Sequence, residues 1–277
     1  MLGDGMSESL TGVDGDDLVR RVLEAANDEL RLFQVAPSVL ARFIDVANRE
    51  DVSDVAIKVL ADSRVMKRVT DDFLVASAAS ALVERDSLTI RTTSSDAERS
   101  LVLIDDDSVV SFVSLDASIG ALQSDEPELC STASEAFEDR WATAEPHDVR
   151  TPPISRVMSS LRREIGDAAA SDFAAMLEVL ETASGDDGLD EVAVALLAAA
   201  RNEVLLYDIS KWGEDSGVAS KATFSRKKTE MEDSGLIDTE NVPIDIGRPR
   251  LRLGFVDDEL HEAPIDDVVA AARDALH

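Results

Sequence analysis

Cysteine, lysine and aromatic residues are scarce in this 277-residue chain, and each shortage narrows what the protein can be. The single cysteine, Cys130, excludes an internal disulfide and offers no Cys/His cluster for a metal ion. No apolar run approaches the ~18 residues that a membrane span needs, and no signal peptide is visible. We therefore expect a soluble, cytoplasmic protein without metal, cofactor or membrane contact.

Basic residues are the second shortage. The chain has 27 of them against 57 acidic residues, and only six are lysine. An acidic surface with few lysines is typical of salt-adapted haloarchaeal proteins, in which multimolar salt shortens the Debye length to about 3 Å or less. On this interpretation the acidic surface is an adaptation to a high-salt solvent and does not indicate a binding partner. The alternative is an acidic surface for a protein partner.

The few basic residues are unevenly distributed. Residues 1–200 carry 17 basic and 40 acidic groups, whereas residues 201–252 carry nine and ten. A near-neutral segment in a strongly acidic chain is relatively basic, which favours contact with a polyanion. High salt weakens the gain from counterion release, so base-edge hydrogen bonds should supply more of the affinity for nucleic acid.

Motifs that carry enzymatic chemistry are missing too. The sequence has no P-loop, no dinucleotide fingerprint and no Gly-x-Ser-x-Gly elbow. His147, His261 and His277 are each expected to be incidental surface residues. Residues 105–107 are three aspartates that could bind Mg²⁺, although a solvated hairpin turn is the favoured interpretation. We expect no catalytic residue and no enzyme.

The first half of the chain alternates strand and helix patterns. Residues 1–15 are rich in Gly, Asp and Ser and are expected to be a disordered tail. Residues 16–145 then predict an α/β domain with a mostly parallel sheet, finished by an antiparallel hairpin. The expected strands are 30–35, 55–60, 88–92, 100–104 and 109–114. A long helix is expected over 63–84, with a break near Thr70.

Small ligands bind by default at the carboxyl ends of parallel strands. The polar residues that this rule selects as possible effector-binding residues are Ser38, Asp62, Ser63, Arg64, Thr92 and Thr93. Arg64 at a helix start could meet a phosphate or a carboxylate. It could equally form a surface ion pair.

The hairpin sequence LVLIDDDSVVSFV and the strand order carry a resemblance. The α/β half is similar to the effector-binding domains of archaeal sugar-responsive regulators, which look like half of a phospholipase D-type fold. Those phospholipase D-type enzymes need a His-x-Lys motif, and none of the three histidines here is followed by such a lysine. The resemblance implies a small-molecule effector rather than catalysis.

The second half predicts helices joined by short turns. Residues 146–170 are expected to be a linker and connecting helix, and 171–260 an α+β winged helix-turn-helix domain. Gly217 supplies a turn, Ser220 an N-cap and Gly235 a helix stop. Between them, an amphipathic helix over 220–234 should bury Phe224 and Met231.

The exposed side of that helix and the following hairpin form the expected DNA-binding surface. The hairpin strands are expected at 241–246 and 250–255, around a basic tip. A helix that fits the major groove beside an arginine-bearing ribbon is typical of a DNA reader. The residues that we expect to contact DNA are Ser220, Lys221, Thr223, Ser225, Arg226, Lys227, Arg248, Arg250 and Arg252. The order of these parts resembles a winged helix-turn-helix, a family that usually has an apolar core residue where this chain has Lys228. The aliphatic stem of Lys228 can partly fill that place.

A short amphipathic helix is expected over 261–277, with an apolar stripe that includes Val268 and Val269. The stripe could fold back or pair with a second subunit, and pairing is favoured because regulators of this type read two half-sites. We therefore expect a homodimer.

Over its whole length the sequence resembles the haloarchaeal TbsP family of transcriptional regulators. The resemblance is best in LLAAARNEVLLYDISKWGEDSGVASKATFSRKKTEMEDSGLI and in the GRPRLRL wing. It implies a sequence-specific regulator of central carbon metabolism genes that binds promoter DNA. The alternative is a non-enzymatic metabolite-sensing or protein-interaction module whose winged domain contacts protein.

Overall fold

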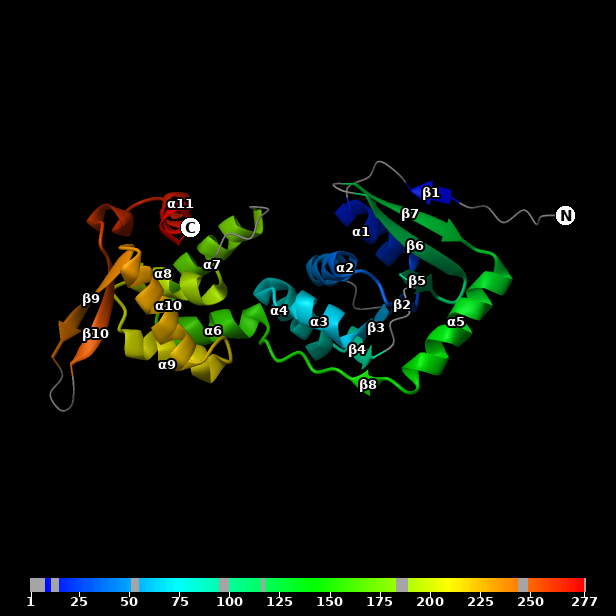
Figure 1. Ribbon diagram of the computed structural model, residues 1–277, viewed down its shortest axis with the longest axis horizontal. Helices are drawn as coiled ribbons and strands as arrows, with labels where there is room; N and C mark the ends of the chain where they lie inside the picture. Colours follow the sequence, from blue (N-terminus) through cyan, green and yellow to red (C-terminus); the bar gives the residue numbers. More distant parts are fainter. Residues whose placement is uncertain are drawn as a thin grey trace. The chain divides into compact units, whose positions relative to one another are not determined.

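The computed structural model describes residues 8–10, 15–50, 55–94, 100–115, 118–182, 189–243 and 249–276. The chain divides into two compact units, Met1–Pro153 and Ile154–His277, each with its own core (Figure 1). The division falls inside the segment expected as a linker. Strand β8 (Glu145–Pro146), at its start, pairs with the sheet of the first unit, and helix α6 (Ile154–Glu164) belongs to the second.

The first unit is built on a mixed eight-stranded sheet in the order β1-β7-β6-β5-β2-β3-β4-β8. Strands β2 (Glu29–Phe33), β3 (Ala56–Asp62) and β4 (Leu88–Thr93) are parallel. Strand β5 (Leu101–Ile104) runs antiparallel to β2 and forms the expected hairpin with β6 (Ser108–Leu115). The predicted α/β fold class is confirmed.

The antiparallel part of the sheet is larger than predicted. Strand β7 (Ser118–Ser124) pairs with β6 along its length, and β1 (Glu8–Leu10) then pairs with β7. The sequence SIGALQS has little β propensity, so the pairing with β6 decides its conformation. The expectation of disorder for the whole tail was wrong at β1, because residues 8–10 form an edge strand.

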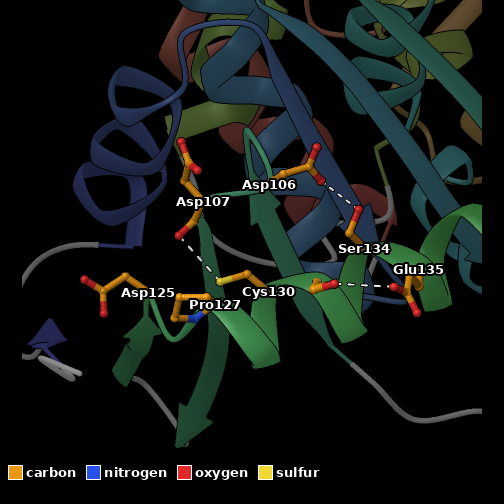
Figure 2. Close-up of a pocket in the computed structure, with 8 residues that line it drawn as sticks. Asp106, Asp107, Asp125, Pro127, Cys130, Ser134 and Glu135 are labelled. Atoms are coloured by element: carbon orange, nitrogen blue, oxygen red, sulfur yellow. Dashed lines mark hydrogen bonds between the residues drawn. The ribbon is translucent and has the colours of Figure 1, made fainter. Parts of the chain in front are cut away.

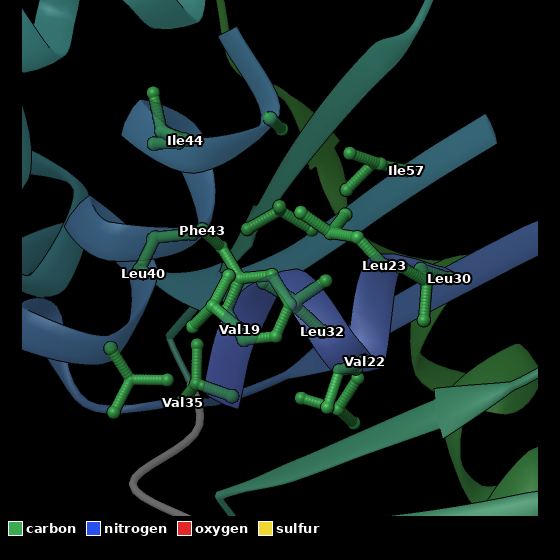
Figure 3. Close-up of a cluster of buried hydrophobic side chains, with 14 of the residues drawn as sticks. Val19, Val22, Leu23, Leu30, Leu32, Val35, Leu40, Phe43, Ile44 and Ile57 are labelled. Atoms are coloured by element: carbon green, nitrogen blue, oxygen red, sulfur yellow. The ribbon is translucent and has the colours of Figure 1, made fainter. Parts of the chain in front are cut away.

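Helices on one face of the sheet enclose the main core. They are α1 (Gly15–Ala25), α2 (Pro37–Arg49), α3 (Ser63–Thr70) and α4 (Phe73–Glu84). Figure 3 shows how side chains of α1 and α2 meet those of β2 and β3 in this core. The predicted break near Thr70 is confirmed: the Asp72 carboxylate caps α4 by accepting from the backbone N–H of Leu74 at 2.9 Å.

Helix α5 (Pro127–Trp141) covers a second, smaller core on the other face. The Phe33 and Phe137 rings meet edge to face with centroids 5.6 Å apart. Trp141 stacks on Phe137 at 5.4 Å. Trp141 is thus a packing anchor, as predicted.

The second unit is a helical bundle with a two-stranded hairpin (Figure 1). Helices α7 (Asp167–Thr182) and α8 (Glu191–Arg201) precede the pair α9 (Leu206–Ser216) and α10 (Lys221–Asp233). The α9 side chain Trp212 lies at the centre of the bundle. Its Nε1–H donates to Ser160 Oγ at 2.9 Å, and its ring meets Phe173 edge to face at 6.1 Å.

The C-terminal helix α11 (Ile265–Leu276) folds back on its own unit. Val268, Val269 and Ala272 are fully buried, and α11 packs against α7 and α10. The favoured pairing of this stripe with a second subunit was therefore wrong, because α7 already supplies the apolar cover that the stripe needs. A dimer, if formed, uses another surface.

Candidate DNA-binding surface

Local signals fix the helix pair α9–α10 as expected. Gly217 ends α9 in the left-handed region at φ +83°, and Gly235 follows α10 at φ +75°. The Ser220 hydroxyl accepts from the backbone N–H of Thr223 at 3.2 Å, which caps α10. Phe224 and Met231 are fully buried. These predictions are confirmed, and together they set which side of α10 faces solvent.

The two helices approach each other unusually closely at Gly213 of α9. A Cβ atom there would lie 2.1 Å from Cε2 and 2.5 Å from Cζ of Phe224. Only a residue without a side chain allows this approach, so Gly213 sets the depth at which Phe224 anchors α10.

The outward face of α10 carries Ala222, Ser225, Arg226 and Thr229, all of them exposed. Lys221 at the start of the helix and Glu230 and Asp233 in its second half are exposed as well. Sequence reasoning selected Ser225 and Arg226 on this face but neither Ala222 nor Thr229. A helical projection centred on the buried Phe224 and Met231 would have found both. Arg226 makes no ion pair or hydrogen bond with any residue that the structure describes.

The three lysines of α10 are committed to carboxylates. Lys221 Nζ lies 2.7 Å from Glu214 Oε2, and Lys228 Nζ lies 2.6 Å from Glu232 Oε2. The Lys228 side chain is only 13% exposed, so its stem does fill the expected core position. Arg226 is therefore the one cation of α10 without a partner among the described residues.

The third lysine, Lys227, does not share the outward face on which it was expected. Its side chain is 12% exposed, and Nζ lies 3.1 Å from Oδ2 of Asp190, the N-cap of α8. Burial alone would lower the pKa of Lys227, but the carboxylates of Asp190 and Glu230 together outweigh it and the pKa is raised. Lys227 thus joins α10 to α8, because the helical step from Phe224 turns it toward the bundle.

The wing hairpin begins earlier than predicted. Strand β9 spans Ile237–Val242 and pairs with β10 (Arg250–Phe255). The predicted start at 241 was therefore wrong, because pairing with β10 extends the strand back to Ile237. Residues 244–246 of the predicted strand lie outside the described residues. Arg248 lies outside the described residues.

The two described wing arginines contact their own domain. The Arg250 guanidinium lies over the exposed Tyr207 ring at 4.2 Å and 3.2 Å from Asp208 Oδ1. Arg252 Nη1 lies 3.8 Å from Glu240 Oε2 and keeps 40% of its side chain exposed. Tyr207, at the first turn of α9, was not selected from the sequence.

The residues expected to bind an effector gather at one edge of the first unit's sheet. Thr92 and Thr93 pair with Ala61 and Asp62 at the carboxyl ends of β4 and β3. Asp62 caps α3 and lies 3.0 Å from Arg64 Nε, whose hydrogen bond lowers the pKa of that carboxyl. The alternative of a surface ion pair for Arg64 is what the geometry shows. The other two, Ser38 and Ser63, are exposed at the starts of α2 and α3.

A hollow of about 350 Å³ lies at the opposite edge of the sheet, near the amino end of β2. Figure 2 shows Asp106 and Asp107 on one side of it and helix α5 on the other. Cys130 Sγ donates to the carbonyl oxygen of Asp107 at 3.5 Å, and burial raises the pKa of this thiol. The acidic lining of the hollow does not form a metal site, because the described part of the chain holds no group of three or more His, Cys, Asp or Glu residues that could bind a metal ion.

The aspartate turn is exposed to solvent at Asp106 and Asp107, as expected, and its Asp105 carboxylate in addition binds the backbone at residues 27–29. The Asp105 carboxylate accepts from the backbone N–H groups of Asn27 at 2.7 Å, Asp28 at 3.0 Å and Glu29 at 2.8 Å. Burial alone would raise its pKa, but these donors outweigh it and lower the pKa to about 2. Asp106 accepts from Ser134 Oγ at 2.7 Å and pairs with Arg31.

The second unit therefore has the parts of a winged helix-turn-helix, a class of DNA-binding domain: a capped helix pair with an exposed outer face, followed by a two-stranded wing. Two family models match the chain. "Transcriptional regulator TbsP-like, N-terminal" covers residues 7–152, and "Transcriptional regulator TbsP-like, C-terminal HTH domain" covers residues 153–273. The chain belongs to the TbsP-like transcriptional regulators.

Solved structures resemble the chain only weakly. Nuc, a phospholipase D family member from Salmonella typhimurium, has a TM-score of 0.38 at 17% identity, over 52% of this chain and 99% of that one. TrmBL2, an archaeal chromatin protein, has a TM-score of 0.38 at 16% identity, over 52% of this chain and 54% of that one. NucT from Helicobacter pylori has a TM-score of 0.37 at 9% identity, over 52% of this chain and 100% of that one. Likenesses this weak carry no argument about function, and no curated protein matches the chain in sequence.

No helix in the described ranges combines the length and apolarity needed to cross a bilayer.

Proposed function

We propose that this protein is a sequence-specific transcriptional regulator that inserts α10 into the major groove of promoter DNA. The observation that carries the proposal is Arg226. It stands exposed on the outward face of a capped helix and, among the described residues, has no partner to satisfy its guanidinium. A planar guanidinium in this position can donate two hydrogen bonds to O6 and N7 of guanine.

The neighbouring groups are suited to positioning α10 on the duplex. Ser220 and Lys221 lie at its first turn, where helix N-termini meet phosphates. Arg252 and Arg248 of the wing would reach the backbone or the minor groove. Arg250 would have to leave Asp208 to do so, whereas Lys227 is committed to Asp190 and contributes to packing.

Three further parts of the proposal rest on the sequence. The acidic composition supports a cytoplasmic protein of a salt-loaded, haloarchaeal type. Two copies would read two half-sites, through a surface other than the buried stripe of α11. The first unit would bind a small effector at the Asp62–Thr93 edge, and the regulated genes would be those of central carbon metabolism, as the resemblance implies.

The proposal is tested by selecting bound duplexes from a random DNA library in high salt and then footprinting the selected site. Arg226→Ala should weaken binding by about 1–3 kcal/mol if the residue reads a base bidentately. Arg163→Ala is the matched control, because its side chain is 70% exposed on α6, outside the helix pair and the wing.

Unchanged protection by Arg226→Ala would remove that residue from the site. Failure to enrich any sequence would favour the alternative, in which the winged domain contacts a protein. Crosslinking in cells, followed by sequencing of the DNA that co-purifies, separates these two outcomes.

A further inference from the structure

The outward face of α10 presents methyl groups beside its single unpaired cation. Thr229 is exposed one turn after Arg226, and Ala222 is exposed one turn before it. The Thr229 hydroxyl donates to the carbonyl oxygen of Ser225 at 3.1 Å, so its proton is committed to its own helix. Thr229 can therefore offer a partner its methyl group and the lone pairs of its hydroxyl oxygen, but no hydrogen-bond donor.

Thymine is the base that presents a methyl group in the major groove, and apolar side-chain atoms recognise it there. Residues three apart on a helix surface have Cβ atoms about 5–6 Å apart. Successive base pairs are about 3.4 Å apart along the duplex. The methyl of Thr229 would therefore meet a base within about two steps of the guanine that Arg226 contacts.

We propose that Thr229 is a specificity-determining residue, whose methyl group selects a thymine within two base pairs of the guanine read by Arg226. This inference rests on the proposed function, because it requires α10 to lie in the major groove. It adds a second base, a thymine, to the recognised sequence and assigns its recognition to an uncharged residue.

The test replaces each thymine of the selected operator by deoxyuridine, which removes only the C5 methyl group. Binding of the full-length chain is measured by fluorescence anisotropy at high salt. Burial of one methyl group corresponds to an affinity change of about fourfold. We expect one thymine per half-site, within two base pairs of the Arg226-dependent guanine, to lose about that much.

Thr229→Ser is the matched variant, because it keeps the hydroxyl that bonds to the Ser225 carbonyl and removes only the methyl. It should weaken binding about fourfold on the thymine operator and have no further effect on the deoxyuridine operator. Thr229→Val keeps the methyl group and puts a second methyl in place of the hydroxyl, so it should retain the preference for thymine. Tryptophan fluorescence of both variants checks that the domain is folded.

Three outcomes have defined meanings. Coupling between the Thr229→Ser and deoxyuridine changes supports the inference. Equal losses for Thr229→Ser on both operators, or insensitivity to every deoxyuridine, overturns it and leaves sequence-specific binding intact. If no operator is selected at all, the proposed function has failed and the inference fails with it.

Discussion

The close contact between Gly213 and Phe224 gives a prediction about how α10 is held. In Gly213→Ala the added Cβ atom would lie 2.1 Å from a ring carbon of Phe224. Carbon atoms in favourable contact are about 3.5–4.0 Å apart, so the ring must retreat by roughly 1.5 Å. Phe224 is fully buried, and that movement carries α10 with it.

Two opposing effects set how much Gly213→Ala changes the free energy of unfolding. Overpacking of a well-filled core costs about 1–3 kcal/mol. Replacing glycine by alanine in a helix interior returns about 1 kcal/mol. We therefore expect a net loss of up to about 2 kcal/mol in the free energy of unfolding, measured by urea denaturation. The loss of operator affinity should be larger than this destabilisation explains, because the folded fraction still holds α10 out of place.

Two companion variants sharpen the assay. Gly254→Ala on β10 is the control, since a Cβ atom there would meet nothing closer than 3.6 Å. Gly213→Ala combined with Phe224→Leu should regain part of the lost stability, because the smaller side chain leaves room for the methyl. If Gly213→Ala is as stable as the wild type and binds its operator equally well, the reasoning about helix approach is refuted.

Two more predictions concern charged groups. Lys227→Met removes the ion pair with Asp190 but keeps a similar volume, so it should lower the unfolding free energy and leave the selected operator sequence unchanged; a changed sequence would put Lys227 in the groove. Asp105→Asn should cost about 1–3 kcal/mol at pH 6, because the backbone N–H groups of Asn27, Asp28 and Glu29 lose a charged acceptor. The folded pKa of about 2 lies below the ordinary 3.8, so the wild-type contribution is present above pH ~4 and is lost as the pH falls through ~2. The difference in unfolding free energy between the variant and the wild type, measured by urea denaturation, should therefore shrink as the pH falls from ~4 to ~2. An equal difference at pH 6 and pH 2.5 would contradict the role of the carboxylate.

The parts that could be predicted from the sequence are those specified by nearby residues. Ser220, Gly217 and Gly235 mark the ends of the helices through capping and positive φ, and these requirements involve only a few residues on either side. The spacing of Phe224 and Met231 then gives the buried face of α10. The parallel strands of the first unit were likewise visible as apolar runs between turn residues.

The remainder depends on contacts between residues far apart in the chain. Lys227 turns inward because Asp190 is the N-cap of another helix, and no local pattern announces that pair. Strand β7 forms because β6 offers an unpaired edge, not because its own residues favour extended structure. The stripe of α11 could be recognised as apolar, but which surface covers it depended on the position of α7.

The pairing of the α10 lysines with carboxylates has a consequence for how such a protein searches a genome. Loose residence on arbitrary DNA, and diffusion along it, depend on cations free to exchange counterions with any phosphate. A recognition helix whose Lys227 and Lys228 are largely buried in ion pairs, which leaves Lys221 and Arg226 as its exposed cations, can make few contacts of this kind. Its time on wrong sequences should be short, and each encounter would be decided by whether the base edges fit.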